Sequence, residues 1–199
     1  MEKRWEVAPK VSADLREQLL ANRRLEEKEE RKKFTEPHLH NLTSTSKLFP
    51  ELEKAVVRLH SAIKNKELIF VYGDYDVDGI TGSAILWETI DYLGGFVLPY
   101  IPSRQSEGYG LHSEALEQLK KEGARVVISV DCGITAVEQA KIAQELGIDL
   151  IITDHHQPQE ELPQPYALIH SADLPGRILI FCNCQALLSH ALPFPQSAV

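Results

Sequence analysis

From residue 68 onward, short apolar runs of strand length alternate with segments of helical periodicity. Apolar runs that lack polar alternation predict strands buried on both faces, and strands separated by helices predict a parallel sheet. The expected fold class is therefore α/β, a parallel sheet with helices on both faces, preceded by a helical N-terminal segment. Pro99 lies within the second run and indicates an edge or irregular position for that strand. The expected strands span residues 68–72, 96–101, 126–130, 150–153 and 166–170, and the expected helices span residues 50–64, 80–93, 112–122 and 134–146.

Polar clusters directly follow three of these expected strands. The first strand is followed by Gly73-Asp74-Tyr75-Asp76-Val77-Asp78-Gly79, the third by Asp131-Cys132-Gly133 and the fourth by Asp154-His155-His156. The carboxyl ends of parallel strands meet at one edge of a sheet, where sites in such folds lie. We therefore expect the three clusters to converge at that edge.

The loop from Gly73 to Gly79 carries three carboxylates at alternate positions. Such carboxylates repel one another unless a cation or protons neutralise them, and oxygen ligands with some imidazole suit Mg²⁺ or Mn²⁺. The loop also resembles the start of a calcium-binding EF-hand, but the glutamate required at loop position 12 is replaced by Ile85. A polar turn with solvated acids is the remaining alternative, and convergence with the other two clusters argues against it.

Two adjacent histidines follow the fourth strand and Asp154. An aspartate beside a histidine can fix the tautomer of the imidazole. Two histidines can then supply one metal ligand and one proton donor or transition-state contact. The alternative is that His155 or His156 is a surface residue or a hydrogen-bonded core residue without a chemical role.

Composition and charge argue against several classes of protein. The net charge is −8, whereas proteins that coat nucleic acid usually present a basic face. No apolar run is long enough to span a membrane, and the first residues lack the apolar stretch of a signal peptide, so we expect a cytoplasmic protein. The three cysteines form no disulfide framework, and Cys182 and Cys184 have no second pair at zinc-finger spacing.

The clusters after the strands resemble the motifs of the DHH phosphoesterases. The loop 73–79 is similar to the first motif of this family in the form found in RecJ-type exonucleases, Val130–Gly133 is similar to the second, and Asp154-His155-His156 is similar to the third. Ser103-Arg104 and Glu107-Gly108-Tyr109-Gly110-Leu111 also resemble a RecJ segment. Pyrophosphatases and oligonucleotide-cleaving relatives usually carry a histidine where this chain has Tyr72, which favours the RecJ branch.

The resemblance implies roles for individual residues. Two Mn²⁺ or Mg²⁺ ions would be held by Asp76, Asp78, Asp131 and His155. Asp74 would sit beside the metals, Asp154 would support the histidines, and His156 would contact the scissile phosphate. For Arg104 the alternatives are support of a phosphate or of the fold, and a surface salt bridge.

The resemblance also implies metal-dependent phosphodiester hydrolysis. In RecJ-like enzymes this is 5′ to 3′ exonuclease action on single-stranded DNA in repair and recombination, so single-stranded DNA and repair proteins are the implied partners. The alternatives are a DHH phosphodiesterase for oligonucleotides or cyclic dinucleotides, and an inactive module that binds a partner. The family's fourth motif is not recognised, since Asp173 is the only acid after Glu161. The DHH-associated domain of RecJ proteins does not fit in the remaining residues.

Three segments are expected along the chain. Residues 1–49 would form a helical extension and linker, with a charged helix over residues 13–33. Residues 50–175 would form a partial DHH domain, and residues 176–199 an atypical tail. No charged residue follows Arg177, which favours either a truncation or frameshift product, or an apolar segment that packs on the sheet or joins a partner. We therefore expect an incomplete fragment of a longer enzyme.

Overall fold

The computed structural model describes residues 7–36, 49–105 and 107–170. The described residues fall into two compact units, one within residues 7–36 and one within residues 49–170. The predicted tail, residues 176–199, lies outside the described residues. No helix in the described ranges is both long and apolar enough to cross a membrane.

The N-terminal unit contains two short helices where the sequence predicted one. The expectation of a single helix over residues 13–33 is wrong because the chain turns at Arg24, whose φ is 56°. The backbone N–H of Leu25 then reaches back to the carbonyl oxygen of Leu20 at 3.1 Å, which closes the first helix. The two helices are α1 (Leu15–Asn22) and α2 (Lys28–Thr35).

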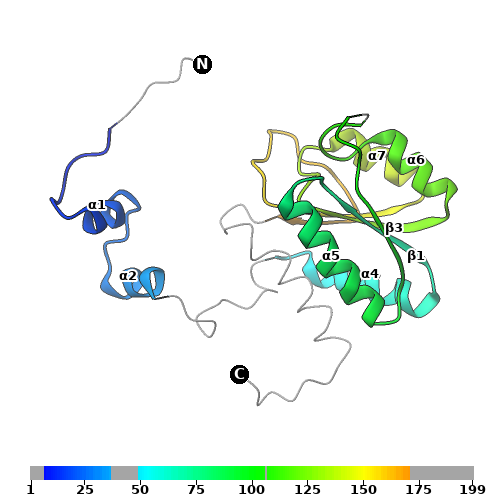
Figure 1. Ribbon diagram of the computed structural model, residues 1–199, viewed down its shortest axis with the longest axis horizontal. Helices are drawn as coiled ribbons and strands as arrows, with labels where there is room; N and C mark the ends of the chain where they lie inside the picture. The colour runs from blue at the N-terminus through cyan, green and yellow to red at the C-terminus, as the bar shows by residue number, and fades with distance from the viewer. Residues whose placement is uncertain (1–6, 37–48, 106, 171–199) are drawn as a thin grey trace, which may run out of the picture. The chain divides into compact units, whose positions relative to one another are not determined.

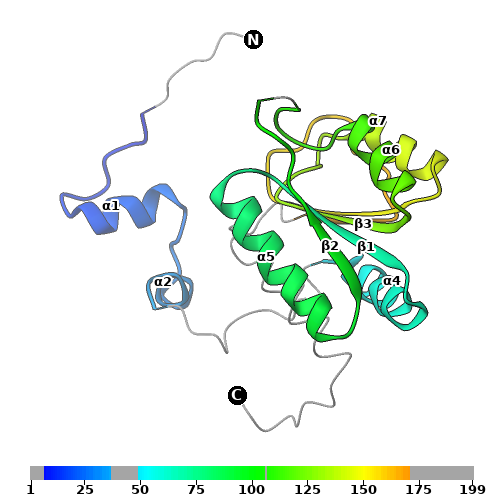
Figure 2. The same cartoon turned by 45° about the vertical axis from the view of Figure 1, so that its right-hand side comes forward.

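The second unit is built on a five-stranded sheet. All neighbouring strands pair in parallel, and their order is β2-β1-β3-β4-β5. The predicted fold class is therefore confirmed, and Figures 1 and 2 show helices on both faces of the sheet. The strands are β1 (Leu68–Gly73), β2 (Phe96–Tyr100), β3 (Ala124–Val130), β4 (Asp149–Asp154) and β5 (Ala167–His170).

The burial of the central strands explains why apolar runs in the sequence predicted their positions. In β1, β3 and β4 nearly every residue is buried, because helices cover both faces of the sheet. In strand β2 only Val97 is buried, and the strand lies at the edge of the sheet, as Pro99 predicted. Proline has no backbone N–H to donate to a further strand, so it is tolerated there.

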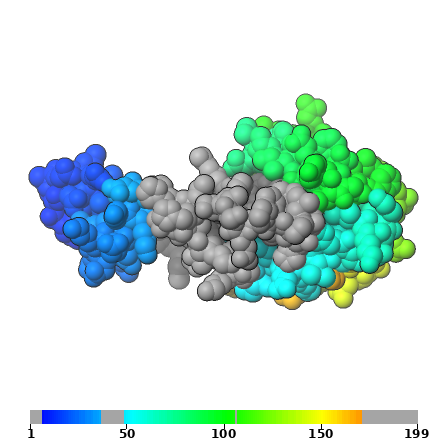
Figure 3. Space-filling model, turned by 90° about the horizontal axis from the view of Figure 1, so that it is seen from below, coloured from blue at the N-terminus to red at the C-terminus, as the bar shows by residue number. Residues whose placement is uncertain are grey.

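Four helices cover the sheet. Helices α4 and α5 pack on one face in one apolar cluster, and α6 and α7 pack on the other face in a second cluster. The predicted helix over residues 50–64 is confirmed, and its residues Leu52, Ala55, Val56 and Leu59 are all buried. Figure 3 shows the unit from the side that α4 (cyan) covers. The helices are α4 (Leu52–Asn65), α5 (Val77–Tyr92), α6 (Ser113–Lys121) and α7 (Val137–Glu145).

The strand order creates a topological switch point at one edge of the sheet. From β1 the chain passes through α5 to β2 on one side of β1, whereas from β3 it passes through α7 to β4 in the opposite direction along the sheet. The two connections therefore lead away from each other at the carboxyl ends of β1 and β3. In open α/β sheets, ligands bind at such a switch point. The first two polar clusters of the sequence follow these two strands.

The opposite edge of the sheet is held by an ion-pair network around Arg58 of α4. Its Nε donates to Asp149 Oδ2 at 2.6 Å, and its Nη2 donates to Glu67 Oε2 at 2.5 Å. The side chain of Arg58 is only 14% exposed. The network ties α4 to the amino ends of β1 and β4, far along the strands from the polar clusters.

Replacing Arg58 by alanine should lower the free energy of unfolding by about 2 kcal/mol, because two partly buried carboxylates lose their charged partner. Urea denaturation of the metal-free chain measures this loss. Lys64→Ala is the control, since Lys64 is exposed on the same helix and its truncation should change the free energy of unfolding by less than about 0.5 kcal/mol. Equal effects of the two substitutions would contradict the role of Arg58 in tying α4 to β1 and β4.

Candidate metal centre

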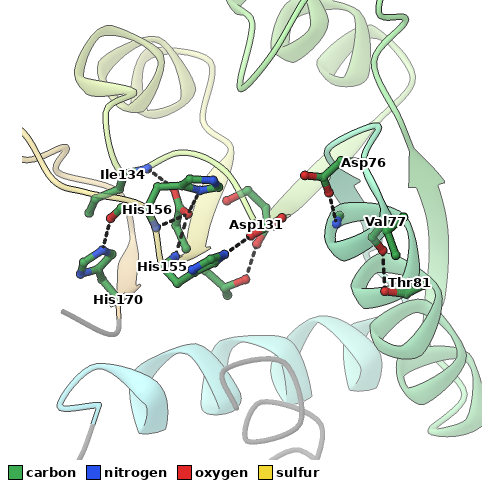
Figure 4. A network of polar contacts seen from close by, with 12 residues as sticks. Asp76, Val77, Thr81, Asp131, Ile134, His155, His156 and His170 are labelled. Carbon is green, nitrogen blue, oxygen red and sulfur yellow. Dashed lines mark hydrogen bonds and ion pairs between the residues drawn. The ribbon is translucent and has the colours of Figure 1, made fainter. Parts of the chain in front are cut away.

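The carboxyl ends of β3 and β4 bring three candidate ligands together. Asp131, His155 and His156 each offer a ligand atom, and these atoms lie within 4.8 Å of one another. The Nε2 atom of His155 is 2.8 Å from Asp131 Oδ1. Figure 4 shows the two side chains pointing toward each other across the ends of the two strands.

Backbone bonds fix the turn that carries Asp131. Its φ of 63° lies in the left-handed region, which aspartate tolerates better than most residues with a side chain. The backbone N–H of Asp131 donates to the carbonyl oxygen of Thr153 at 3.0 Å, and Ser129 Oγ donates to the carbonyl oxygen of Cys132 at 2.7 Å. The carboxylate of Asp131 is therefore held beside β4, only 5% exposed.

Asp154 holds His155 and His156 in place through hydrogen bonds. Its carboxylate is 1% exposed and accepts hydrogen bonds from the backbone N–H groups of His155 and His156, at 2.7 and 3.1 Å. It also accepts from the buried N–H of Ile134 at 2.8 Å, and Asp154 Oδ1 is 2.8 Å from His156 Nδ1. On the other side of the turn, His170 Nε2 lies 2.7 Å from the carbonyl oxygen of His156.

The loop between β1 and α5 contributes two acids near this cluster. Asp76 is the N-cap of α5 and accepts from the backbone N–H of Gly79 at 2.9 Å. Figure 4 shows Asp76 on the far side of Asp131 from His155. The charge of Asp76 acts on both Asp131 and His156, and the charge of His156 acts on Asp74. The loop therefore faces the ends of β3 and β4.

Close backbone packing shapes this loop. A Cβ atom at Gly79 would lie 2.5 Å from the backbone carbonyl oxygen of Asp74, so only glycine fits where the start of α5 meets the end of β1. Asp74 is buried as a result, at 1% exposed. Among the described residues, its Oδ1 atom has no hydrogen-bond partner. A buried carboxylate oxygen without a donor beside other acids fits a cation-binding site.

The close cluster contains only Asp131, His155 and His156 of the predicted site residues, and the predicted ligands Asp76 and Asp78 both lie outside it and are exposed. Asp78 is exposed in the first turn of α5, and the grouping of ligand atoms within the described ranges does not include it. The guanidinium carbon of Arg104 lies 5.4 Å from the centre of the Tyr75 ring, a distance at which a cation–π contact forms. Arg104 therefore contacts the first-motif loop, and its role toward a phosphate stays a prediction.

Tyr109 lies in the site although no role for it was predicted from the sequence. Its hydroxyl lies 3.1 Å from Nδ1 and 3.2 Å from Nε2 of His156. The sequence signal that could have identified it is the glycine on each side of Tyr109. Such a pair of glycines indicates a backbone conformation that other residues rarely adopt, with an exposed side chain between them.

Burial and neighbouring charges shift the pKa values of the cluster. Burial raises the pKa of Asp131 to about 6, opposed by His155 and His156 and reinforced by Asp76 and Asp154. Burial also raises the pKa of Asp74. Partial burial lowers the pKa of His156, but its hydrogen bond to Asp154 and the charge of Asp154 outweigh this, so the net shift is upward. A bound cation would instead favour the ionised carboxylates.

In a chelating buffer, the free energy of unfolding should fall as the pH rises from about 4 to about 6, and should continue to fall above 6.5. The folded chain holds a proton on Asp131 up to about pH 6, above the ordinary value of 3.8, so folding is favoured on the acid side of that interval. The raised pKa of His156 acts in the same direction above 6.5. Thermal unfolding at a series of pH values measures the slope.

Asp131→Asn provides the comparison for this pH dependence. Asparagine accepts the left-handed backbone and carries no charge, so the variant should have a flatter profile. At pH 7.5 without metal it should be more stable than the natural chain by about 1 kcal/mol. Parallel profiles for the two proteins would show that Asp131 does not titrate differently in the folded state.

The match to a known family agrees with this arrangement. The family described as "DHH family, N-terminal domain" matches residues 68–191, which is more than half of the chain. The chain belongs to the DHH family. The match starts at β1 and includes all three polar clusters, and it continues past His170 into the segment where we recognised no further motif.

Relatives confirm the predicted resemblance to RecJ. The chain is 45% identical over 145 residues to the single-stranded-DNA-specific exonuclease RecJ of Bacillus subtilis (strain 168), covering 71% of this chain and 18% of the relative. A structure described as exonuclease RecJ bound to manganese is 35% identical with a TM-score of 0.66, covering 71% of this chain and 38% of that one. RecJ of Thermus thermophilus in complex with Mn²⁺ is 31% identical, with a TM-score of 0.66 and coverage of 84% of this chain and 24% of that one.

Proposed function

We propose that this chain carries the metal-binding part of a phosphodiester hydrolase, a RecJ-like 5′ to 3′ exonuclease that acts on single-stranded DNA. The observation that carries the proposal is the cluster of Asp131, His155 and His156 at the carboxyl ends of β3 and β4, beside the switch point of the sheet. Relatives described as single-stranded-DNA-specific exonucleases support the substrate class. The chain spans about a fifth of the length of those relatives, so the activity of a whole enzyme is part of the proposal.

The donor set fits Mn²⁺ or Mg²⁺. Asp76, Asp78, Asp131 and His155 would hold two ions, and the buried unpaired oxygen of Asp74 would face them. Carboxylate oxygens with one imidazole suit these hard cations. When bound, such ions supply charge neutralisation for a phosphodiester and acidify a water molecule.

The residues of the chain have separate tasks in this proposal. Asp154 holds the Nδ1 atom of His156, so a phosphate oxygen would be contacted through Nε2, beside or in place of the hydroxyl of Tyr109. The raised pKa of His156 favours its charged form near neutral pH, which suits contact with an anion. Arg104, held over Tyr75, would approach the phosphate backbone from the side of the first-motif loop.

The test uses single strands labelled at either the 5′ or the 3′ end, incubated with the full 199-residue chain and Mn²⁺. We expect early release of mononucleotides from the 5′ label, and no release in chelator. Release from the 3′ end first would contradict the polarity. Absence of metal-dependent cleavage of any strand would contradict the exonuclease proposal for this chain and favour a module that only binds a partner.

A second candidate is hydrolysis of short substrates. The net charge of −8 favours it, since a long single strand needs a basic surface to neutralise its phosphates. Dinucleotides and cyclic dinucleotides, assayed beside the long strands under the same conditions, separate the two candidates. A higher kcat/KM on dinucleotides would favour the small-substrate phosphodiesterase.

A further inference from the structure

Tyr109 contacts His156 across 47 residues of sequence. Its hydroxyl lies 3.1 and 3.2 Å from the two ring nitrogens of His156, and the rings meet edge to face with their centres 5.7 Å apart. The same hydroxyl is 3.4 Å from the backbone carbonyl oxygen of Asp131. Tyr109 therefore touches residues that follow both β3 and β4.

The protons on His156 decide which partner donates in this contact. Asp154 Oδ1 lies 2.8 Å from Nδ1, and a carboxylate can only accept, so Nδ1 carries a proton. The hydroxyl of Tyr109 lies 3.2 Å from the other nitrogen, Nε2, to which it can donate when the ring is neutral and from which it can accept when the ring is charged. One hydrogen bond leaves the imidazole free to swing, whereas two contacts on different atoms fix its plane.

The backbone around Tyr109 is built to present this side chain. Gly108 and Gly110 have φ values of 87° and 92°, which residues with a side chain rarely adopt. A Cβ atom at either position would meet nothing within 4 Å, so packing does not explain the two glycines. Their conformational freedom does, because it turns the Tyr109 side chain toward His156.

Hydrogen bonds hold residues on either side of Tyr109, in the connection between β2 and α6, against the sheet. The hydroxyl of Tyr72, a buried residue of β1, donates to the carbonyl oxygen of Gly110 at 3.0 Å. The carboxylate of Glu107 accepts from the backbone N–H of Ser103 at 2.6 Å and from the hydroxyl of Tyr100 at 2.5 Å. These bonds hold the segment on both sides of Tyr109.

We propose that Tyr109 is a positioning residue for His156, and that its hydroxyl and the carboxylate of Asp154 together set the orientation of the imidazole. Part of this inference rests on the proposed function, in which His156 contacts the scissile phosphate. A tyrosine that merely rested on the surface would need neither the left-handed glycines nor the fastened segment around it.

The first test is Tyr109→Phe in the full chain, which removes the hydroxyl and keeps the ring. We expect kcat on a labelled single strand to fall about tenfold, as for loss of one hydrogen bond that acts in the transition state. KM and the calorimetric affinity for Mn²⁺ should stay within about twofold, since Tyr109 is not among the proposed ligands. Tyr92→Phe is the matched control, because Tyr92 is 74% exposed on α5, and it should leave kcat unchanged.

The second test reads His156 directly and needs no catalysis. In the metal-free chain, the ¹⁵N and ¹H signals of the His156 ring, assigned by their loss in His156→Gln, should shift and broaden in Tyr109→Phe and not in Tyr92→Phe. Gly108→Ala, which keeps the tyrosine but opposes the backbone conformation, should give the same change. Unaltered His156 signals in Tyr109→Phe would overturn the inference. If the natural chain cleaves nothing, the proposed function fails, while these signals still decide the role of Tyr109.

Discussion

Replacing Asp131 by asparagine is expected to slow metal-dependent phosphodiester cleavage by roughly a thousandfold, which corresponds to the several kcal/mol that a metal ion contributes to a transition state. Asp131 is the acid that directly contacts His155 at the end of β3. Asparagine keeps the left-handed backbone of residue 131 and removes the charge that a cation requires. Initial rates on labelled single strands with saturating Mn²⁺ measure the effect.

The matched control for this substitution is Asp91→Asn, because Asp91 is an exposed acid near the end of α5. It should cleave at the rate of the natural chain. If Asp131→Asn retained a rate within about tenfold of the control, Asp131 would not be a ligand that the reaction needs. The same substitution is expected to stabilise the metal-free chain above about pH 7, so loss of activity with a gain in stability would identify a residue kept for function.

Replacing Asp154 by alanine should lower the free energy of unfolding by about 3 kcal/mol, because it leaves buried N–H groups without an acceptor. The carboxylate accepts from the backbone of Ile134, His155 and His156, and of these Ile134 is fully buried. The ring of His156 also loses its partner at Nδ1. Cleavage should therefore fall together with stability.

Urea denaturation of the metal-free variant measures this loss, again beside a substitution of Asp91, here Asp91→Ala. Asp154→Asn has nearly the same shape but offers a single acceptor oxygen, so an intermediate loss is expected. A free energy of unfolding equal to that of the control would contradict the role of Asp154 as the support of the two histidines.

The strands of the sheet could be predicted from the sequence because the central strands are buried on both faces. Helices on each side demand apolar residues at most positions of β1, β3 and β4, which gives continuous runs that are easy to recognise. Pro99 likewise marked the edge strand, since a proline cannot pair on both sides. The break at Arg24 was missed because a left-handed helix end can form without glycine.

The convergence of Asp131 with His155 also followed from the sequence, since both residues stand at the carboxyl ends of strands. Their direct contact depends on β3 and β4 being neighbours, which only the pairing of the strands shows. The contact of Tyr109 with His156 depends on how the segment between β2 and α6 crosses the sheet, and no local pattern encodes it. The exposed position of Asp78 likewise depends on where α5 begins.

Calorimetric titration of Mn²⁺ into the full chain tests the metal centre most directly, because it requires no substrate. We predict saturable binding in the natural chain, retained in Asp91→Asn and lost or weakened at least about tenfold in Asp131→Asn. Heats no larger than those of dilution, or equal binding by the natural chain and Asp131→Asn, would contradict a metal centre at the ends of β3 and β4.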